Sequence, residues 1–123
     1  MRTEPTAQPA PFRQLQDLPM GMIIKHYQLR AAEGSAAALR VALDDLGRKL
    51  AVIGGVAGVE LYQDVEDANR FIFIERWQTD ASYAQGSKLI DKAALKSVLA
   101  HLDAPPELAK LAAVSAGGFA LAE

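Results

Sequence analysis

The stretch that decides the fold reads Arg70-Phe71-Ile72-Phe73-Ile74-Glu75-Arg76-Trp77, and it ends on the only tryptophan of the chain. Bulky aromatic and β-branched residues favour strands, and a near-continuous apolar run is typical of a strand that is covered on both faces. Helices can cover one face in a chain of 123 residues, and we expect a second copy of the protein to cover the other. The stretch therefore predicts a buried central strand in a homodimer.

The residues before this strand predict a strand, a helix and a second strand. Residues 22–29 are typical of a first strand, and Ser35 stands where it can cap a helix. Apolar residues then recur at spacings of three and four, which is the period of a helix with one buried face. This stripe consists of Leu39, Leu43, Leu46, Leu50 and Ile53. After a glycine-rich break, residues 59–63 predict a strand that forms a hairpin with the central one.

The residues after the central strand complete an α+β pattern. We expect a short helix over residues 80–88, a longer one over 91–101, and a last strand around 111–116. The order is strand, helix, strand, strand, helix, strand, with the second helix broken near Gly86. This is the ferredoxin-like β-α-β-β-α-β arrangement.

Composition excludes several classes of partner and site. The formal charge is only -2, so we expect no nucleic-acid surface, and no apolar stretch is long enough to predict a membrane anchor. The chain has no cysteine, which excludes disulfides and thiolate chemistry and fits a cytoplasmic protein.

The N-terminal residues differ in composition from the rest. Four prolines lie among polar residues within the first twenty positions, so we predict an arm over residues 1–20 and one domain over 21–123. A loose tail explains this composition. The alternative is an arm that docks through Phe12, Leu15 and Leu18 on its own subunit or on a neighbour.

Three of these features together resemble the antibiotic biosynthesis monooxygenase superfamily. They are the segment Gly58-Val59-Glu60-Leu61-Tyr62, the strand that ends Glu75-Arg76-Trp77, and the helix that begins just after it. The resemblance covers residues 22–114. It implies a dimeric α+β barrel in which two four-stranded sheets pack face to face. It also implies a small-molecule cavity between the sheet and the helices of each subunit.

The resemblance also implies site residues. In cofactor-independent members an Asn, a Trp and a Tyr line the cavity, and Trp77 and Tyr83 stand at the spacing of the last two. Phe73 stands where the Asn would be, and a phenyl ring cannot hydrogen-bond a substrate anion. Haem-degrading members carry a histidine soon after the tryptophan, whereas this chain has Gln85-Gly86-Ser87-Lys88. Haem degradation is therefore disfavoured.

We predict catalytic roles for Trp77, Tyr83 and His26, because His26 can accept a phenolic proton near neutral pH. The structural alternative is that Trp77 and Tyr83 are core residues and that His26 has no chemical role. We place Tyr27 on a packing surface, on the other side of its strand from His26.

The predicted substrate contacts come from one face of the central strand, because strand residues alternate between faces. They are Phe71, Phe73 and Glu75. A desolvated Glu75 would have a raised pKa and could act as a general base. Alternatively, Glu75 pairs with Lys25 or with Arg76 of a neighbouring chain. We expect Trp77 and Tyr83 to share one cavity, with Phe73 as its wall and His26 at its edge.

No cofactor is predicted. The glycines do not form a dinucleotide-binding pattern, and the two histidines form no metal motif, so we expect no flavin, nicotinamide, haem or metal. The leading hypothesis is oxidation of phenolic or polycyclic aromatic substrates, in which the substrate's own anion reacts with oxygen. The alternatives are a non-oxidative ligand-binding or isomerase-type protein and an accessory protein with a vestigial pocket. The sequence does not name the substrate.

Overall fold

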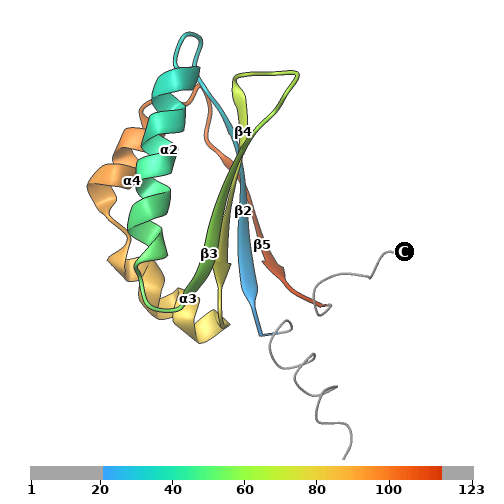
Figure 1. Ribbon diagram of the computed structural model, residues 1–123, viewed down its shortest axis with the longest axis vertical. Helices are drawn as coiled ribbons and strands as arrows, with labels where there is room; N and C mark the ends of the chain where they lie inside the picture. Colours follow the sequence, from blue (N-terminus) through green and yellow to red (C-terminus); the bar gives the residue numbers. More distant parts are fainter. Residues whose placement is uncertain (1–20, 115–123) are drawn as a thin grey trace, which may run out of the picture.

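The computed structural model describes residues 21–114, which form a four-stranded antiparallel sheet with helices packed on one face (Figure 1). The strands lie in the order β3-β4-β2-β5. In chain order the elements are β2 (Ile23–Arg30), α2 (Ala36–Ala51), β3 (Val56–Gln63), β4 (Arg70–Trp77), α3 (Asp80–Gly86), a 3₁₀ turn (Ser87–Leu89), α4 (Lys92–Leu99) and β5 (Glu107–Ala112). The predicted ferredoxin-like α+β fold is confirmed. The predicted arm over residues 1–20 lies outside the described residues.

The central strand β4 divides its side chains between the two faces of the sheet. Alternate residues Phe71, Phe73, Glu75 and Trp77 are buried against the helices. Ile72 and Ile74 point to the other face and are half-buried. Within residues 21–114, helices cover only the first face, so the cover of the second face stays a prediction.

Helix α2 supplies most of the core opposite the sheet. The predicted stripe is buried from Leu39 to Leu50, and Ile53, just beyond the helix, packs against the same core. The outer face carries the i to i+4 ion pairs Asp44–Arg48 and Asp45–Lys49. Such exposed pairs stabilise a helix by only about 0.2–0.5 kcal/mol each, so burial of the stripe dominates.

Ser35 is a correction to the predicted caps. It precedes α2 as expected, but its side chain makes no capping hydrogen bond. The following two helices are capped by side chains instead. Thr79 accepts from the backbone N–H of Ser82 at 2.9 Å, and Asp91 accepts from that of Ala94 at 2.8 Å.

Two strand boundaries differ from the prediction. The last strand lies at Glu107–Ala112 rather than at 111–116, because pairing with β2 sets its position and its mostly exposed side chains leave no apolar pattern. The second strand begins at Val56 and passes through Gly58 with a register shift. Glycine at such an irregularity does not end a strand. The predicted break of the second helix near Gly86 is confirmed.

Candidate functional site

A partly enclosed cavity of about 90 Å³, hereafter the enclosed cavity, lies between the sheet and helices α2 and α4. Its walls are almost entirely hydrocarbon, with Leu46 from α2, Leu99 from α4 and Phe73 from β4 among them. Only two lining residues carry polar side-chain atoms, Tyr27 from β2 and Glu75 from β4. The cavity therefore places one carboxyl group and one phenol in apolar surroundings.

The carboxyl group of Glu75 is the chemically distinctive group of this cavity. Its residue is only 3% exposed, and burial raises the pKa of the carboxyl group above its usual range. Hydrogen bonds from Trp77 and Tyr27 and the nearby charge of Lys25 act in the opposite direction without cancelling that effect. A carboxylate with a raised pKa in an apolar site is suited to accept a proton.

Tyr27 is the second polar group of the cavity. Burial, followed by the charge of Glu75, raises the pKa of its phenol far above the usual value. The phenol therefore stays protonated and can act as a hydrogen-bond donor. Its ring also packs against Phe73, with the ring centroids 6.1 Å apart.

Trp77 fixes the side chain of Glu75 by a hydrogen bond. Its indole Nε1 donates a hydrogen bond to Oε1 of Glu75 at 3.0 Å. The ring is 0% exposed and lies under Gly86, where an added Cβ would come within 2.3 Å of ring atom Cζ3. A glycine at this position lets the end of α3 rest directly on the indole.

Tyr83 contacts Trp77 and binds a buried lysine. The two aromatic rings are T-shaped at 5.5 Å between centroids. Lys25 is 6% exposed, and its Nζ donates to the Tyr83 hydroxyl at 3.0 Å. Lys110, the β5 partner of Lys25, lies 5.0 Å from the centroid of the same ring. Buried and half-exposed ammonium groups thus surround this phenol.

The structure brings most of the predicted site residues to one face of the sheet but not into one cavity. Phe73 and Glu75 line the enclosed cavity. Trp77 and Tyr83 contact each other on the same side of the sheet, yet neither belongs to the cavity lining. Trp77 reaches the cavity only indirectly, through its hydrogen bond to Glu75, and Tyr83 packs on Trp77.

His26 lies on the opposite face of the sheet. It pairs with Ile74 in the β2–β4 register, so its side chain points away from the helices and from Glu75. The structure therefore does not place it at the cavity edge. Tyr27, which sequence reasoning assigned to a packing surface, takes that place. Alternation places Tyr27 and Lys25 on one face of β2, but only the register shows that this face is the cavity side, because it pairs Tyr27 with Phe73 and Lys25 with Glu75.

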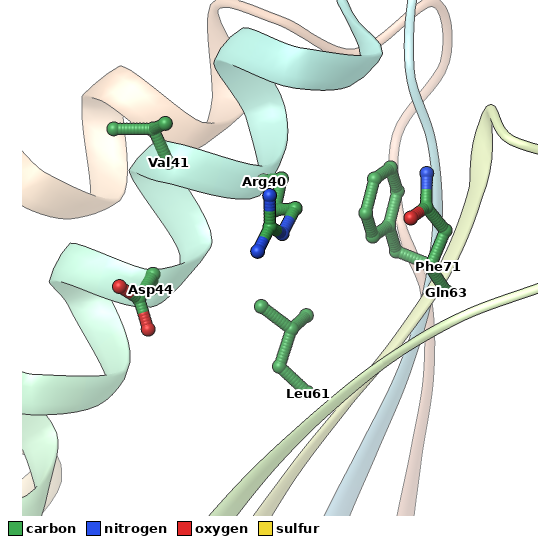
Figure 2. Close-up of a pocket in the computed structure, with 6 residues that line it drawn as sticks. All are labelled: Arg40, Val41, Asp44, Leu61, Gln63 and Phe71. Atoms are coloured by element: carbon green, nitrogen blue, oxygen red, sulfur yellow. The ribbon is translucent and has the colours of Figure 1, made fainter.

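Phe71 borders a second hollow, a cleft of about 370 Å³ between α2 and the sheet. Figure 2 shows the guanidinium of Arg40 between the helix and Phe71, with Leu61 on the strand below. This cleft is larger but open, and Val41 on its rim is 67% exposed. Water can reach its charged groups, so the enclosed cavity is the better place for proton chemistry.

Two negative findings concern the described residues alone. Between residues 21 and 114, no three histidine, aspartate or glutamate side chains are grouped to hold a metal ion. No helix in that range is long and apolar enough to cross a membrane.

Solved structures share this fold at low sequence identity. A protein from Pseudomonas aeruginosa is 23% identical, with a TM-score of 0.66, and the match covers 79% of this chain and 98% of that one. A conserved protein from Methanosarcina mazei is 16% identical, with a TM-score of 0.70 and coverage of 77% and 95%. A variant of SnoaB, a cofactor-independent oxygenase from Streptomyces nogalater, is 14% identical, with a TM-score of 0.64 and coverage of 76% and 93%.

No curated protein matches the chain. The model of one family, described as antibiotic biosynthesis monooxygenase, matches residues 22–86, which is just over half of the chain. This match confirms the resemblance in the strand that ends on Trp77 and in the hairpin before it. The chain belongs to the antibiotic biosynthesis monooxygenase family.

Proposed function

We propose that the protein oxidises a phenolic or polycyclic aromatic substrate without a cofactor, with Glu75 as the general base. The observation that carries this proposal is the buried carboxyl group of Glu75, whose pKa is raised, at the wall of an enclosed apolar cavity. Family membership supports the reaction class, and the likeness to SnoaB supports the fold.

The reaction needs no group beyond the substrate and dioxygen. Glu75 takes the hydroxyl proton, and the electron-rich phenolate then supplies electrons to O₂. One oxygen atom enters the ring and the other leaves as water, so a phenol and O₂ give a quinone and water. The protein contributes deprotonation, orientation and exclusion of bulk water.

Other residues hold the base rather than react. The indole N–H of Trp77 fixes one oxygen of Glu75 at 3.0 Å. The protonated phenol of Tyr27 lines the cavity beside the same carboxyl group and can act as a hydrogen-bond donor there. Phe73 forms part of the apolar wall where other family members use a hydrogen-bonding residue. In this proposal Glu75 and Tyr27 take over the polar role of that position.

Oxygen consumption tests the proposal. Phenols, naphthols and hydroquinones are offered to the purified protein in an oxygen electrode, and quinone formation is followed by absorbance. Glu75→Gln should abolish oxygen uptake because a side-chain amide does not act as a base near neutral pH. Glu66→Gln, in the exposed turn before β4, is the matched control and should retain full activity. Equal uptake by Glu75→Gln and the unmodified protein would contradict the role of Glu75. Ligand binding without any uptake would favour the non-oxidative alternative.

We also propose that a second copy covers the open face of the sheet. Ile72 and Ile74 of β4 lie on that face. Tyr62, the β3 partner of Ile72, and Leu111, farther across the same face on β5, are about half exposed. Full burial of an exposed isoleucine is worth about 1.5–3 kcal/mol, and these two are already half-buried, so association would add only part of that value for each. Association through this face would remove that apolar surface from water.

A further inference from the structure

We propose that the enclosed cavity takes a neutral molecule with a single hydrocarbon ring and one hydroxyl group, an alkylphenol in class. This inference rests on the proposed function, because it names the substrate of the same cavity. It narrows that function by favouring one ring over the polycyclic substrates.

The charge of the lining favours a neutral ligand. Glu75 and Tyr27 are the only polar side chains among the residues that line the cavity, and no cationic residue is among them. Lys25, the nearest buried cation, turns its Nζ to Tyr83 instead. An anionic ligand would therefore meet a carboxylate without a counter-charge, while further hydroxyl groups on a ligand would be buried without partners.

The carboxylate of Glu75 has room for one more donor. A carboxylate offers about four lone-pair sites on two oxygens. The indole of Trp77 occupies one of them, and the phenol of Tyr27, which lines the same cavity, can occupy a second. A ligand hydroxyl that donates a hydrogen bond to one of the remaining sites would point its proton directly at the general base.

The size of the cavity favours a single ring. Its volume is about 90 Å³, whereas an engineered dry cavity of about 150 Å³ accepts benzene. One ring therefore needs a modest outward shift of the wall, and a fused second ring needs a much larger one. The wall can give way at α4, because Leu95 and Leu99 line the cavity and are 41% and 47% exposed. Leu46 on α2, by contrast, is only 5% exposed and belongs to the core.

Binding measured without oxygen tests this proposal separately from turnover. The probes are 4-ethylphenol, ethylbenzene, 4-ethylbenzoate and 2-naphthol, titrated anaerobically by calorimetry and by the fluorescence of Trp77, the only tryptophan. We expect 4-ethylphenol to bind at least tenfold more tightly than each of the other three. Ethylbenzene lacks the hydroxyl group, 4-ethylbenzoate is an anion, and 2-naphthol has a second ring.

Two variants locate the ligand. Glu75→Gln should weaken the binding of 4-ethylphenol at least tenfold and leave the binding of ethylbenzene unchanged. The control variant Glu66→Gln should change the binding of neither compound. Leu46→Phe adds a ring to the cavity wall and should abolish binding of both, with a thermal melt to check that the variant is folded. Tighter binding of 4-ethylbenzoate or 2-naphthol would overturn the proposal, and so would 4-ethylphenol binding that neither variant affects.

Failure of this proposal and failure of the proposed function have different signatures. The expected binding order without any oxygen uptake would refute the oxidation and leave the ligand class standing. Oxygen uptake with two-ring substrates alone would refute the ligand class and leave the oxidation standing.

Discussion

Replacing Gly86 by alanine tests whether the indole of Trp77 is wedged under the end of α3. A Cβ at this position would lie 2.3 Å from Cζ3 and 2.9 Å from Cη2 of Trp77, and 3.1 Å from Cγ2 of Ile53. The nearest contact must lengthen by roughly 1 Å to become an ordinary van der Waals distance. The ring cannot simply retreat, because Glu75 binds its nitrogen and Tyr83 packs against it. Overpacking of this kind destabilises a core by about 1–3 kcal/mol.

The assay combines denaturation with tryptophan fluorescence. A loss of about 1–3 kcal/mol should lower Tm by about 4–12 °C in a chain of this size. The emission of the single tryptophan should also shift, since its ring is displaced. Gly54→Ala is the matched control, because nothing lies within 4 Å of a Cβ there. A Gly86→Ala protein with the Tm and emission of the unmodified protein would refute the packing argument, and with it the support that Trp77 gives to Glu75.

The remaining predictions concern charge, hydrogen bonding and association. The folded pKa of Glu75 is raised, so its contribution to stability is complete below its ordinary pKa of 4.5 and is lost as pH rises through the folded value. The free energy of unfolding of Glu75→Gln should therefore rise relative to that of the unmodified protein as pH rises through that window. Chemical denaturation at several pH values measures this difference, and a difference that does not change with pH would contradict the prediction. Tyr83→Phe should destabilise by about 1–3 kcal/mol because Lys25 loses its acceptor, and adding Lys25→Met should restore most of the loss in a double-mutant cycle. Ile72→Asp and Ile74→Asp should convert a dimer into a monomer in light scattering, whereas an unmodified protein that is monomeric at micromolar concentration would contradict the covered face.

The fold could be predicted because its strongest signals are periodic and local. The stripe from Leu39 to Leu50 has the period of a helix, and the run that ends at Trp77 has the composition of a central strand. The edge strand β5 has neither, since most of its side chains are exposed and its position depends on pairing with β2. Its predicted location was wrong for that reason.

The candidate site could be predicted only in part, because it depends on register between strands. Alternation correctly placed Phe73 and Glu75 on one face of β4. Which of His26 and Tyr27 shares that face depends on how β2 pairs with β4, and composition does not encode this pairing. A slip of one residue would exchange the two side chains. The contact between Trp77 and Gly86 was also beyond reach, since it depends on how closely α3 approaches the sheet.

The pairing of β2 with β4 also explains why Glu75 keeps a raised pKa beside a buried lysine. Lys25 stands directly opposite Glu75, but its ammonium group donates to Tyr83 at 3.0 Å, and its charge is the smallest of the influences on the carboxyl group. A direct ion pair would favour the charged carboxylate and lower its pKa, which would make it a weak base. The indole of Trp77 instead supplies a neutral donor that fixes the carboxylate while only partly offsetting its desolvation. Tyr83 thus matters to the proposed chemistry without lining the cavity, because its hydroxyl binds the ammonium group of Lys25, the one buried cation in the described part of the chain.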